Sequence, residues 1–232
     1  MKIKTSIIIC TVIVNSILFY SCGGVSNTTT LNESSTSQSI SSLKVVTIGK
    51  QVWMTENLKV NTFKNGDSIT EAKTDEEWKK ASENQQPAWC YYNNDPNNGE
   101  KYGKLYNWYA VNDPRGLAPQ GYHIPTDAEW SILSNYLGAT SGGKIKSTSG
   151  WNENANGSNE SGFNAFPGGC RVAINALAPN GFANMGDECD WWSSTENDKE
   201  FAWFYNLNNT DGSLFRSFTN KSIGYSIRCL RD

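Results

Sequence analysis

Alternating apolar and polar positions mark both ends of the folded part of the chain. Residues 43–60, LKVVTIGKQVWMTENLKV, place β-branched and aromatic residues on either side of Gly49-Lys50, which predicts a hairpin. The same texture returns toward the C-terminus in five short runs, of which we expect the last four to form an antiparallel meander. These runs are CRVAINAL, WWSST, FAWFYNL, SLFRSF and IGYSIRCL, at 170–177, 191–195, 201–207, 213–218 and 223–230.

The stretch GYHIPTDAEW, followed by SILSNYLG, predicts a helix with a defined start and stop. Thr126 has the N-cap role and Glu129 follows three positions later, as in a capping box, while Pro125 keeps the preceding residue extended. The apolar face at spacings of three and four and the terminating glycine are Trp130, Leu133, Leu137 and Gly138.

Two further segments have helical signals. Thr74 to Glu77 form another capping-box pattern directly before Trp78. Residues 103–113, GKLYNWYAVND, carry Leu105 and Trp108 at helical spacing and predict a helix, although their aromatic residues would also suit a strand.

A Gly- and Asn-rich stretch, residues 141–169, separates these helices from the late strands. It is too long for an ordinary connection, so it predicts a functional or calcium-stabilised loop region. Many short strands around few helices, in roughly 190 residues from position 45 onward, predict a single α+β domain over 45–232.

The first 22 residues are typical of an export signal. Lys2 and Lys4 precede a short apolar run that ends at Ser21-Cys22, which resembles the lipobox of bacterial lipoproteins. We expect lipidation of Cys22 and anchoring to the outer membrane, on its periplasmic or surface face. The alternative is an ordinary secretory signal cut near Ser21. Residues 23–44 contain a run in which eleven of eighteen residues are Ser or Thr, which predicts a disordered tether.

Charge and cysteine content narrow the function classes. Without the signal, eighteen basic and twenty-three acidic residues leave a net charge of −5 and no basic patch, which argues against nucleic acid. Apart from Cys10 in the signal and Cys22 at the lipidation site, the chain has four cysteines, and in an exported chain they predict disulfides. Three pairings are open; we favour Cys170–Cys189, with Cys90–Cys229 following by exclusion. A single histidine and the lack of a CxxC motif argue against zinc.

His123 is the only histidine of the chain and lies just before the second capping box. A catalytic triad would need a nucleophile and an acid beside it. No G-x-S-x-G elbow supplies that nucleophile. We therefore expect a structural histidine that packs on Tyr122 or bonds a backbone carbonyl.

Carboxylates and amides gather in three loops. The groups 187–190 and 196–200 could contain a hydrolase acid and base, but we expect solvated loop charges. The alternative is that these loops bind calcium as a cofactor, because calcium prefers clustered carboxylate and amide oxygens. The proposed ligands are Asn94, Asp95, Asn97 and Glu100, with Asn93 and Asn98 beside them, and in a second loop Glu196, Asn197 and Asp198.

Trp191 and Trp192 are the best functional signal among nine tryptophans. Successive residues of a strand point to opposite faces, so one ring enters the core and the other faces a loop or solvent. An exposed ring could stack on a sugar while nearby polar groups bond its hydroxyls. The alternative is that the long loop, with Trp151, covers the second ring.

Several stretches together resemble a known family. NDPNNGEKYGKLYNWYAV, APQGYHIPTDAEW, GFNAFPGG, WWSSTE and YSIRCLRD are similar to the Fibrobacter succinogenes major paralogous domain, over about residues 45–232. That family occurs in lipoproteins and secreted proteins. More distantly, HIPTDAEW and SIRCLRD resemble formylglycine-generating sulfatase-modifying enzymes. This implies a C-type-lectin-like fold with two main helices, a twisted antiparallel sheet and long irregular loops, and such folds often bind calcium.

The sequence differs from formylglycine-generating enzymes at the metal-binding cysteines. Formylglycine-generating enzymes hold copper with two nearby cysteines, and Cys229 has no such neighbour in sequence. We therefore expect a lipid-anchored binding or adhesion module for a glycan, another surface polymer or a surface protein. Its expected ligand-binding residues are Trp191, Trp192, Glu196, Asn197 and Asp198. The alternatives are an enzyme, either a degenerate relative of those oxidases or a carboxylate hydrolase, and a structural envelope protein.

Overall fold

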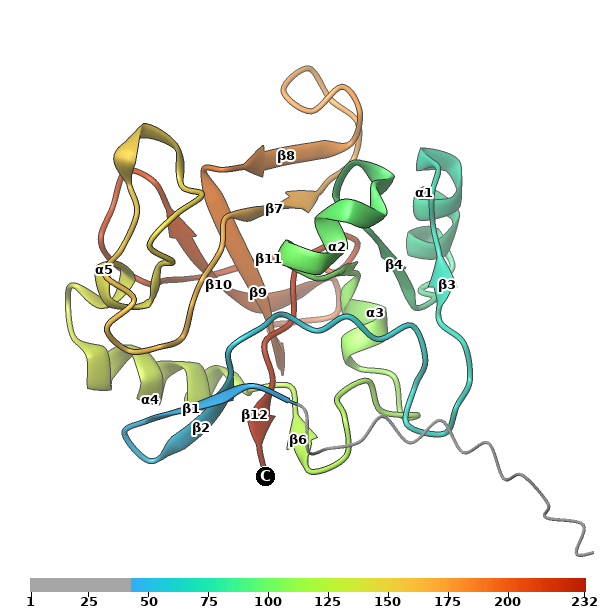
Figure 1. Ribbon diagram of the computed structural model, residues 1–232. Coiled ribbons are helices and arrows are strands. Elements are labelled where there is room, and N and C mark those ends of the chain that lie inside the picture. The colour runs from blue at the N-terminus through green and yellow to red at the C-terminus, as the bar shows by residue number, and fades with distance from the viewer. Residues whose placement is uncertain (1–42) are drawn as a thin grey trace, which may run out of the picture. The chain divides into compact units, whose positions relative to one another are not determined.

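The computed structural model describes residues 43–232, which form one compact unit by themselves. The predicted signal, Cys22 and the tether up to residue 42 lie outside the described residues. Within 43–232 the fold is mixed α+β, as predicted, with three sheets, one of them curled into a half-barrel (Figure 1). None of the helices in this part combines the length and apolarity that crossing a bilayer requires.

Three sheets and five helices make up the described domain. The first sheet has the order β1 (Val45–Ile48), β2 (Gln51–Met54), β12 (Leu230–Arg231), β6 (Tyr122–His123). The second has the order β11 (Phe215–Asn220), β10 (Phe201–Asn208), β9 (Glu188–Glu196), β7 (Gly168–Arg171), β8 (Phe182–Met185). The third joins β3 (Thr70–Glu71), β4 (Ala88–Cys90) and β5 (Leu105–Tyr106). The helices are α1 (Asp75–Glu83), α2 (Pro96–Tyr102), α3 (Trp108–Val111), α4 (Asp127–Leu137) and α5 (Ser141–Ile145).

Elements that carry a complete local signal form where the sequence predicts them. Strands β1 and β2 pair antiparallel and turn at Gly49, whose φ of 61° suits glycine. Helices α1 and α4 begin at Thr74 and Thr126, each with both hydrogen bonds of the capping box. Helix α4 ends at Gly138 and buries its predicted apolar face.

One segment, whose aromatic residues fit both helical and strand periodicity, differs from the prediction. Residues 103–113 do not form one helix, because Leu105 and Tyr106 pair with β4. The side chain of Asn107 then caps the single turn of α3.

Helix α2 was not predicted, so three helices rather than two have seven or more residues. It begins at Pro96 under the Asp95 cap.

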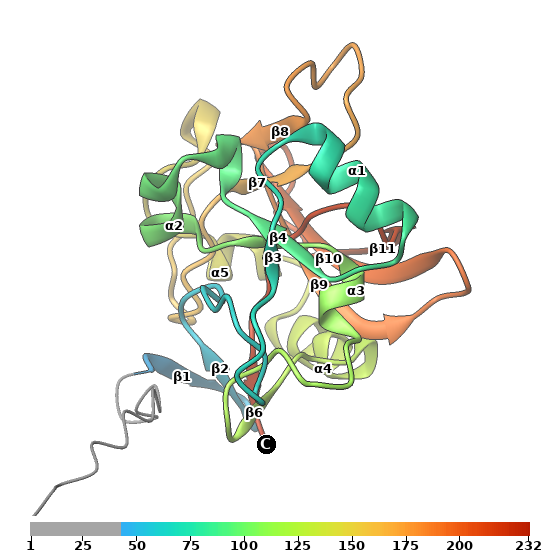
Figure 2. The same ribbon diagram turned by 90° about the vertical axis from the view of Figure 1, so that its right-hand side faces the viewer.

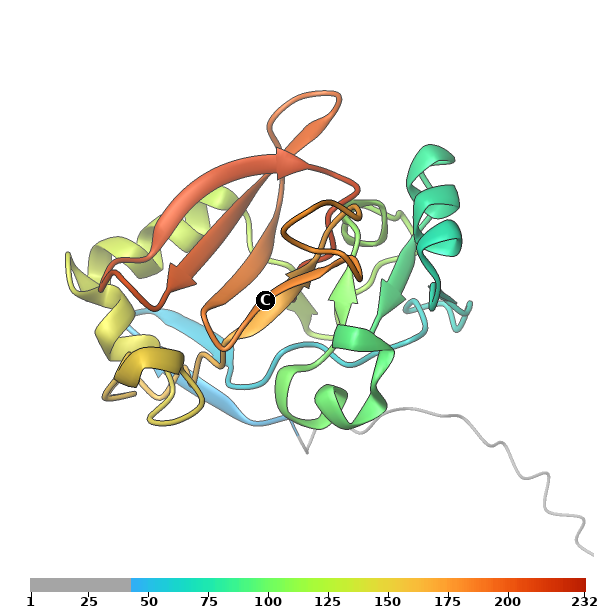
Figure 3. The ribbon, with the colours of Figure 1, turned by 90° about the horizontal axis from the view of Figure 1, so that it is seen from above.

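The late strands give an antiparallel meander of three rather than four. Strands β9, β10 and β11 pair in succession, and seen from above they curl together with β7 (Figure 3). The expected fourth strand, residues 223–230, instead crosses between the sheets. It forms single bridges to Tyr106, Arg171 and Trp191 before it ends as β12.

A buried arginine ties this crossing segment to the rest of the domain. Arg228 is 1% exposed; its Nε donates to Oδ1 of Asn57 (3.0 Å) and its Nη1 to the carbonyls of Met54 (3.1 Å) and Phe163 (2.5 Å). Asn57 Oδ1 also accepts from Nε1 of Trp191 (2.9 Å). Burial lowers the pKa of Arg228 to about 10, so the guanidinium remains charged at neutral pH.

The four cysteines are free thiols, which corrects the predicted disulfides. Gly169 lies directly opposite Cys189 in the pairing of β7 with β9, so the next residue, Cys170, points to the other face of the sheet. Cys90 packs in the cluster beside α1, while Cys229 belongs to the larger core. Burial raises the pKa of Cys90 and Cys229 to about 12.

Replacing Arg228 should destabilise the whole domain. Arg228→Met leaves the carbonyls of Met54 and Phe163 without a donor, and we expect a loss of about 3 kcal/mol in denaturant unfolding. Arg231→Met, on an exposed arginine three residues away, is the control and should cost under about 1 kcal/mol. Equal losses in the two variants would contradict the central role of Arg228.

The thiol assignment predicts a specific mass. Residues 43–232, denatured without a reductant and alkylated, should carry four adducts by mass spectrometry. Under native conditions alkylation should be slow, because burial removes access and disfavours the thiolate. Two adducts or none on the denatured chain would restore the disulfide interpretation.

Candidate functional site

His123 is held between two carboxylates. Its Nδ1 lies 2.8 Å from Oδ1 of Asp232 and its Nε2 lies 2.9 Å from Oε1 of Glu129. Glu129 is at the same time the capping-box residue of α4. His123 is thus held at the start of α4 by two carboxylates rather than by a backbone carbonyl, and its structural role stays a prediction.

The proposed calcium loop surrounds the start of α2. Asp95 caps this helix, with Oδ1 accepting from the backbone nitrogen of Asn97 (3.0 Å), and Asn94 donates to the carbonyl of Lys73 (2.5 Å). The Glu100 side chain is 92% exposed and lies 3.9 Å from Lys59. No group of three or more His, Cys, Asp or Glu in residues 43–232 is arranged to hold a metal ion. Calcium binding here stays a prediction.

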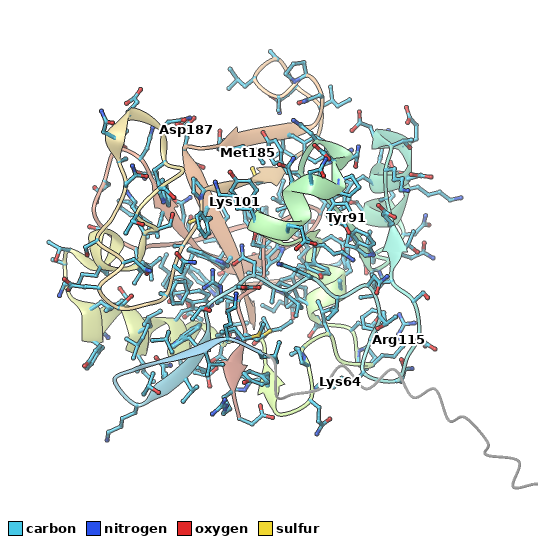
Figure 4. All side chains as sticks on the ribbon, in the orientation of Figure 1. Lys64, Tyr91, Lys101, Arg115, Met185 and Asp187 are labelled. Carbon is cyan, nitrogen blue, oxygen red and sulfur yellow. The ribbon has the colours of Figure 1, made fainter. Side chains whose placement is uncertain are left out.

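Helix α2 is also fixed by packing. Gly99 leaves room for the Tyr91 ring, where a Cβ would collide, and Figure 4 labels Tyr91 together with Lys101, which belongs to α2. Nζ of Lys101 lies 5.1 Å from the centre of the Phe166 ring. The loop therefore has a packed and capped architecture that needs no ion to explain it.

The carboxylates at 187–190 are bound to amides. Asp187 (Figure 4) accepts from Asn152 and Asn209. Asp190 accepts from Asn206 at 2.7 Å, while its Oδ2 is buried without a partner among residues 43–232. Burial raises the pKa of Asp190 to about 8. A raised pKa is typical of a catalytic acid, but burial is its first cause at Asp190, so the shift alone does not indicate catalysis.

Trp191 and Trp192 are both fully buried, which corrects the expectation that one ring is exposed. They do point to opposite faces, but each face of this sheet is covered by a hydrophobic cluster. Trp191 donates to Asn57, and Trp192 donates to the carbonyl of Tyr106 at 2.8 Å. Neither ring can serve as an exposed stacking platform.

An exposed group of aromatic rings lies on the neighbouring strands instead. We define the aromatic face as Phe201 and Trp203 of β10 with Arg216 and Phe218 of β11. The Phe218 ring is 50% exposed and meets Trp203 and Phe201 edge-on, with centroids 5.5 and 5.9 Å apart. The guanidinium carbon of Arg216 lies 3.3 Å from the Trp203 ring centre.

Strand register and the start of α4 create this face. Trp203 pairs with Phe218 and Tyr205 with Arg216, so all four side chains project from the same side of the sheet. Helix α4 covers this side at Tyr205, whose hydroxyl bonds Asp127. Asp127 also holds Arg216 with two hydrogen bonds of 2.6 and 2.9 Å. Beyond Asp127 the sheet continues without a helix over it, and the β9–β10 hairpin projects (Figure 2).

The predicted residues Glu196, Asn197 and Asp198 form the turn next to the aromatic face. Asp198 accepts from the backbone nitrogens of Glu200 and Phe201, at 2.8 and 2.9 Å, and these bonds lower its pKa. Buried Lys221 bonds Glu196 and two carbonyls of the turn. These side chains therefore position Phe201, and calcium binding at this turn stays a prediction.

The aromatic face was missed by sequence reasoning for an identifiable reason. FAWFYNL and SLFRSF carry aromatic residues on both faces of their strands, and nothing local says where α4 stops covering them. The alternation of Phe201, Trp203 and Tyr205 was the available signal, but Tyr205 is buried and the other two are only half-buried.

Comparison with known proteins identifies the domain. The chain matches the Fibrobacter succinogenes major domain over residues 46–231, nearly the whole described part. The chain belongs to this family. No curated protein and no solved structure matches it significantly. The boundaries of the Fibrobacter succinogenes major domain run from the first hairpin to the last strand, so the Arg228 contacts and the aromatic face both belong to it.

Asp190 gives this Fibrobacter succinogenes major domain a specific pH dependence. A carboxyl whose folded pKa is raised costs stability as pH rises from about 4 to about 8, with a slope of up to about 1.4 kcal/mol per pH unit. Asp190→Asn should remove this decline and be the more stable protein at pH 7. Chemical denaturation at pH 5, 6, 7 and 8 measures it. Asp211→Asn, an exposed position, should follow the wild type, and an unchanged slope in Asp190→Asn would contradict the assignment.

Proposed function

We propose that this chain is a lipid-anchored, exported binding module with a C-type-lectin-like fold, which recognises a glycan or another surface polymer through the aromatic face. The observation that carries the proposal is the gathering of Phe201, Trp203 and Phe218 beside a fixed guanidinium on an uncovered end of a sheet. Aromatic rings present large apolar surfaces that suit the apolar face of a sugar ring.

The polar neighbours of these rings suit hydroxyl groups. Arg216 offers several N–H donors in a plane, and its orientation is fixed by Asp127. Asn197 lies in the adjoining turn, and Asn220, which pairs with Phe201, is exposed on β11. Because Asp127 already neutralises Arg216, we expect a neutral rather than an acidic glycan.

The shape of the site favours a polymer over a small substrate. The rings lie on an open strand pair at the edge of the five-stranded sheet, with β11 as the outermost strand. An enzyme would need titratable groups that converge in a concave pocket. Of the carboxylates that the sequence offered for this role, Asp198 caps a turn, Asp187 is bonded to two amides and Asp190 is sealed in the core. Binding is therefore the better-supported function.

The anchor extends this proposal to the cell envelope. Cys22 behind a lipobox-like segment would attach the chain to the outer membrane, and the Ser/Thr-rich tether would give the domain reach. Calcium, through the loops at 94–100 and 196–198, remains part of the proposal and is tested together with binding.

Removing one ring should abolish glycan recognition. Residues 43–232 are applied to a glycan array with and without calcium, beside Trp203→Ala and Phe218→Ala, and each variant should bind at least about tenfold more weakly. Phe215→Ala is the matched control, because Phe215 is 40% exposed on β11 but projects from the opposite face.

Three other results would redirect the proposal. Binding that survives in both variants would place the ligand elsewhere on the domain. Equal loss in Phe215→Ala would indicate a general effect on β11 rather than a specific face. Silence of the wild type on glycans, with and without calcium, would contradict glycan recognition and favour a protein partner.

A further inference from the structure

A cavity of about 500 Å³ lies between α1 and the segment that follows β7. None of the residues that line it belongs to the aromatic face. Trp78, Lys79 and Ser82 of α1 form one side, and Arg171 to Ile174 form the other, with Ser222 between them. Figure 2 shows α1 alongside the connection from β7 to β8.

Arg171 is the notable group of this cavity. Its side chain is 2% exposed, and Nη2 donates to Asp75. Its Nε is buried and has no hydrogen-bond partner in residues 43–232. A guanidinium carries five N–H donors, so one carboxylate leaves part of this fork unused. An unpaired buried donor is unfavourable unless something else supplies an acceptor.

The surroundings hold Arg171 in place. Gly224 lies where a Cβ would stand 2.7 Å from the Arg171 Cβ and 2.9 Å from the Trp78 ring. At Gly181 a Cβ would come within 2.8 Å of the Asp75 carboxylate. The centre of the Phe182 ring lies 4.4 Å from the guanidinium carbon. This packing fixes the arginine instead of leaving it free to turn toward solvent.

The walls of the cavity are apolar on the strand side, and the charged groups of the lining, two basic and three acidic, sum to −1. Val172, Ala173 and Ile174 supply the apolar wall, and Ile174 is 54% exposed. On α1, Lys79 lies 3.7 Å from Glu83, so these two charges face each other. Asp75 and Glu76 disfavour a doubly charged anion, so the unused donors of Arg171 suit a group with a single negative charge.

We infer that this cavity binds an apolar monocarboxylate, with its carboxylate at the Arg171 guanidinium and its apolar body along Val172–Ile174. A carboxylate matches the planar donor fork and brings one negative charge, while the chain behind it covers the exposed Ile174 side chain. The site is separate from the aromatic face and independent of the proposed glycan function.

Nuclear magnetic resonance titration of ¹⁵N-labelled residues 43–232 tests the inference. Hexanoate should shift the amides of Lys79, Ala173 and Ile174 with a Kd of roughly 1 mM, as expected for a ligand of this size. Hexanamide has the same shape without the charge and should bind about tenfold more weakly. Equal affinity for acid and amide would reduce the site to an apolar hollow and overturn the inference.

Two substitutions in one loop separate the cavity from its surroundings. Ile174→Glu places a negative charge on the wall and should abolish hexanoate binding. Leu177→Glu makes the same change on a side chain that is 94% exposed outside the cavity, and should bind as the wild type does. Arg171→Lys keeps the charge without the fork and should weaken binding to the level of the amide. Absence of shifts with about 20 mM hexanoate, or binding that Ile174→Glu leaves unchanged, would overturn the inference.

Discussion

The buried charge of Arg228 is the constraint on which the rest of the fold depends. Among residues 43–232 it has no carboxylate partner, and its hydrogen bonds go to Asn57 and to the carbonyls of Met54 and Phe163. A charged group in an apolar interior is tolerated only when hydrogen bonds such as these compensate for its burial. The first hairpin, the long loop and the C-terminal segment must therefore meet at one point.

This meeting point explains why the five-stranded sheet is buried on both faces at β9. The C-terminal segment crosses the sheets at Tyr106, Arg171 and Trp191 before it joins β2, and so it closes the second face. Both tryptophans of β9 become core residues as a result. On the face of the sheet that α4 covers, aromatic side chains remain exposed where the strands extend past α4, and there Asp127 and Arg216 define the border.

The Asn-rich loops illustrate how a ligand-like composition can have a backbone cause. Positive φ occurs at several asparagines of these loops, where asparagine tolerates the left-handed region better than other side chains do. Their side chains then bond nearby backbone, as Asn94 does with Lys73. A cluster of oxygen-bearing residues in sequence is therefore weak evidence for a metal, because turns require the same residues. These asparagines are Asn93, Asn94, Asn154, Asn159, Asn164 and Asn184.

The sequence by itself determined the elements that short-range interactions complete. Both capping boxes, the hairpin at Gly49, three of the four expected meander strands and the family could be predicted, because their signals lie within a few residues or in ordered motifs. Only the tertiary structure decided which side chains face solvent and whether any two cysteines lie within disulfide distance. Cys170 and Cys189 lie on adjacent strands yet on opposite faces, and Trp203 is uncovered only because α4 begins at Asp127. Such outcomes depend on register and on where one element stops covering another, and these are set by contacts between segments far apart in the chain.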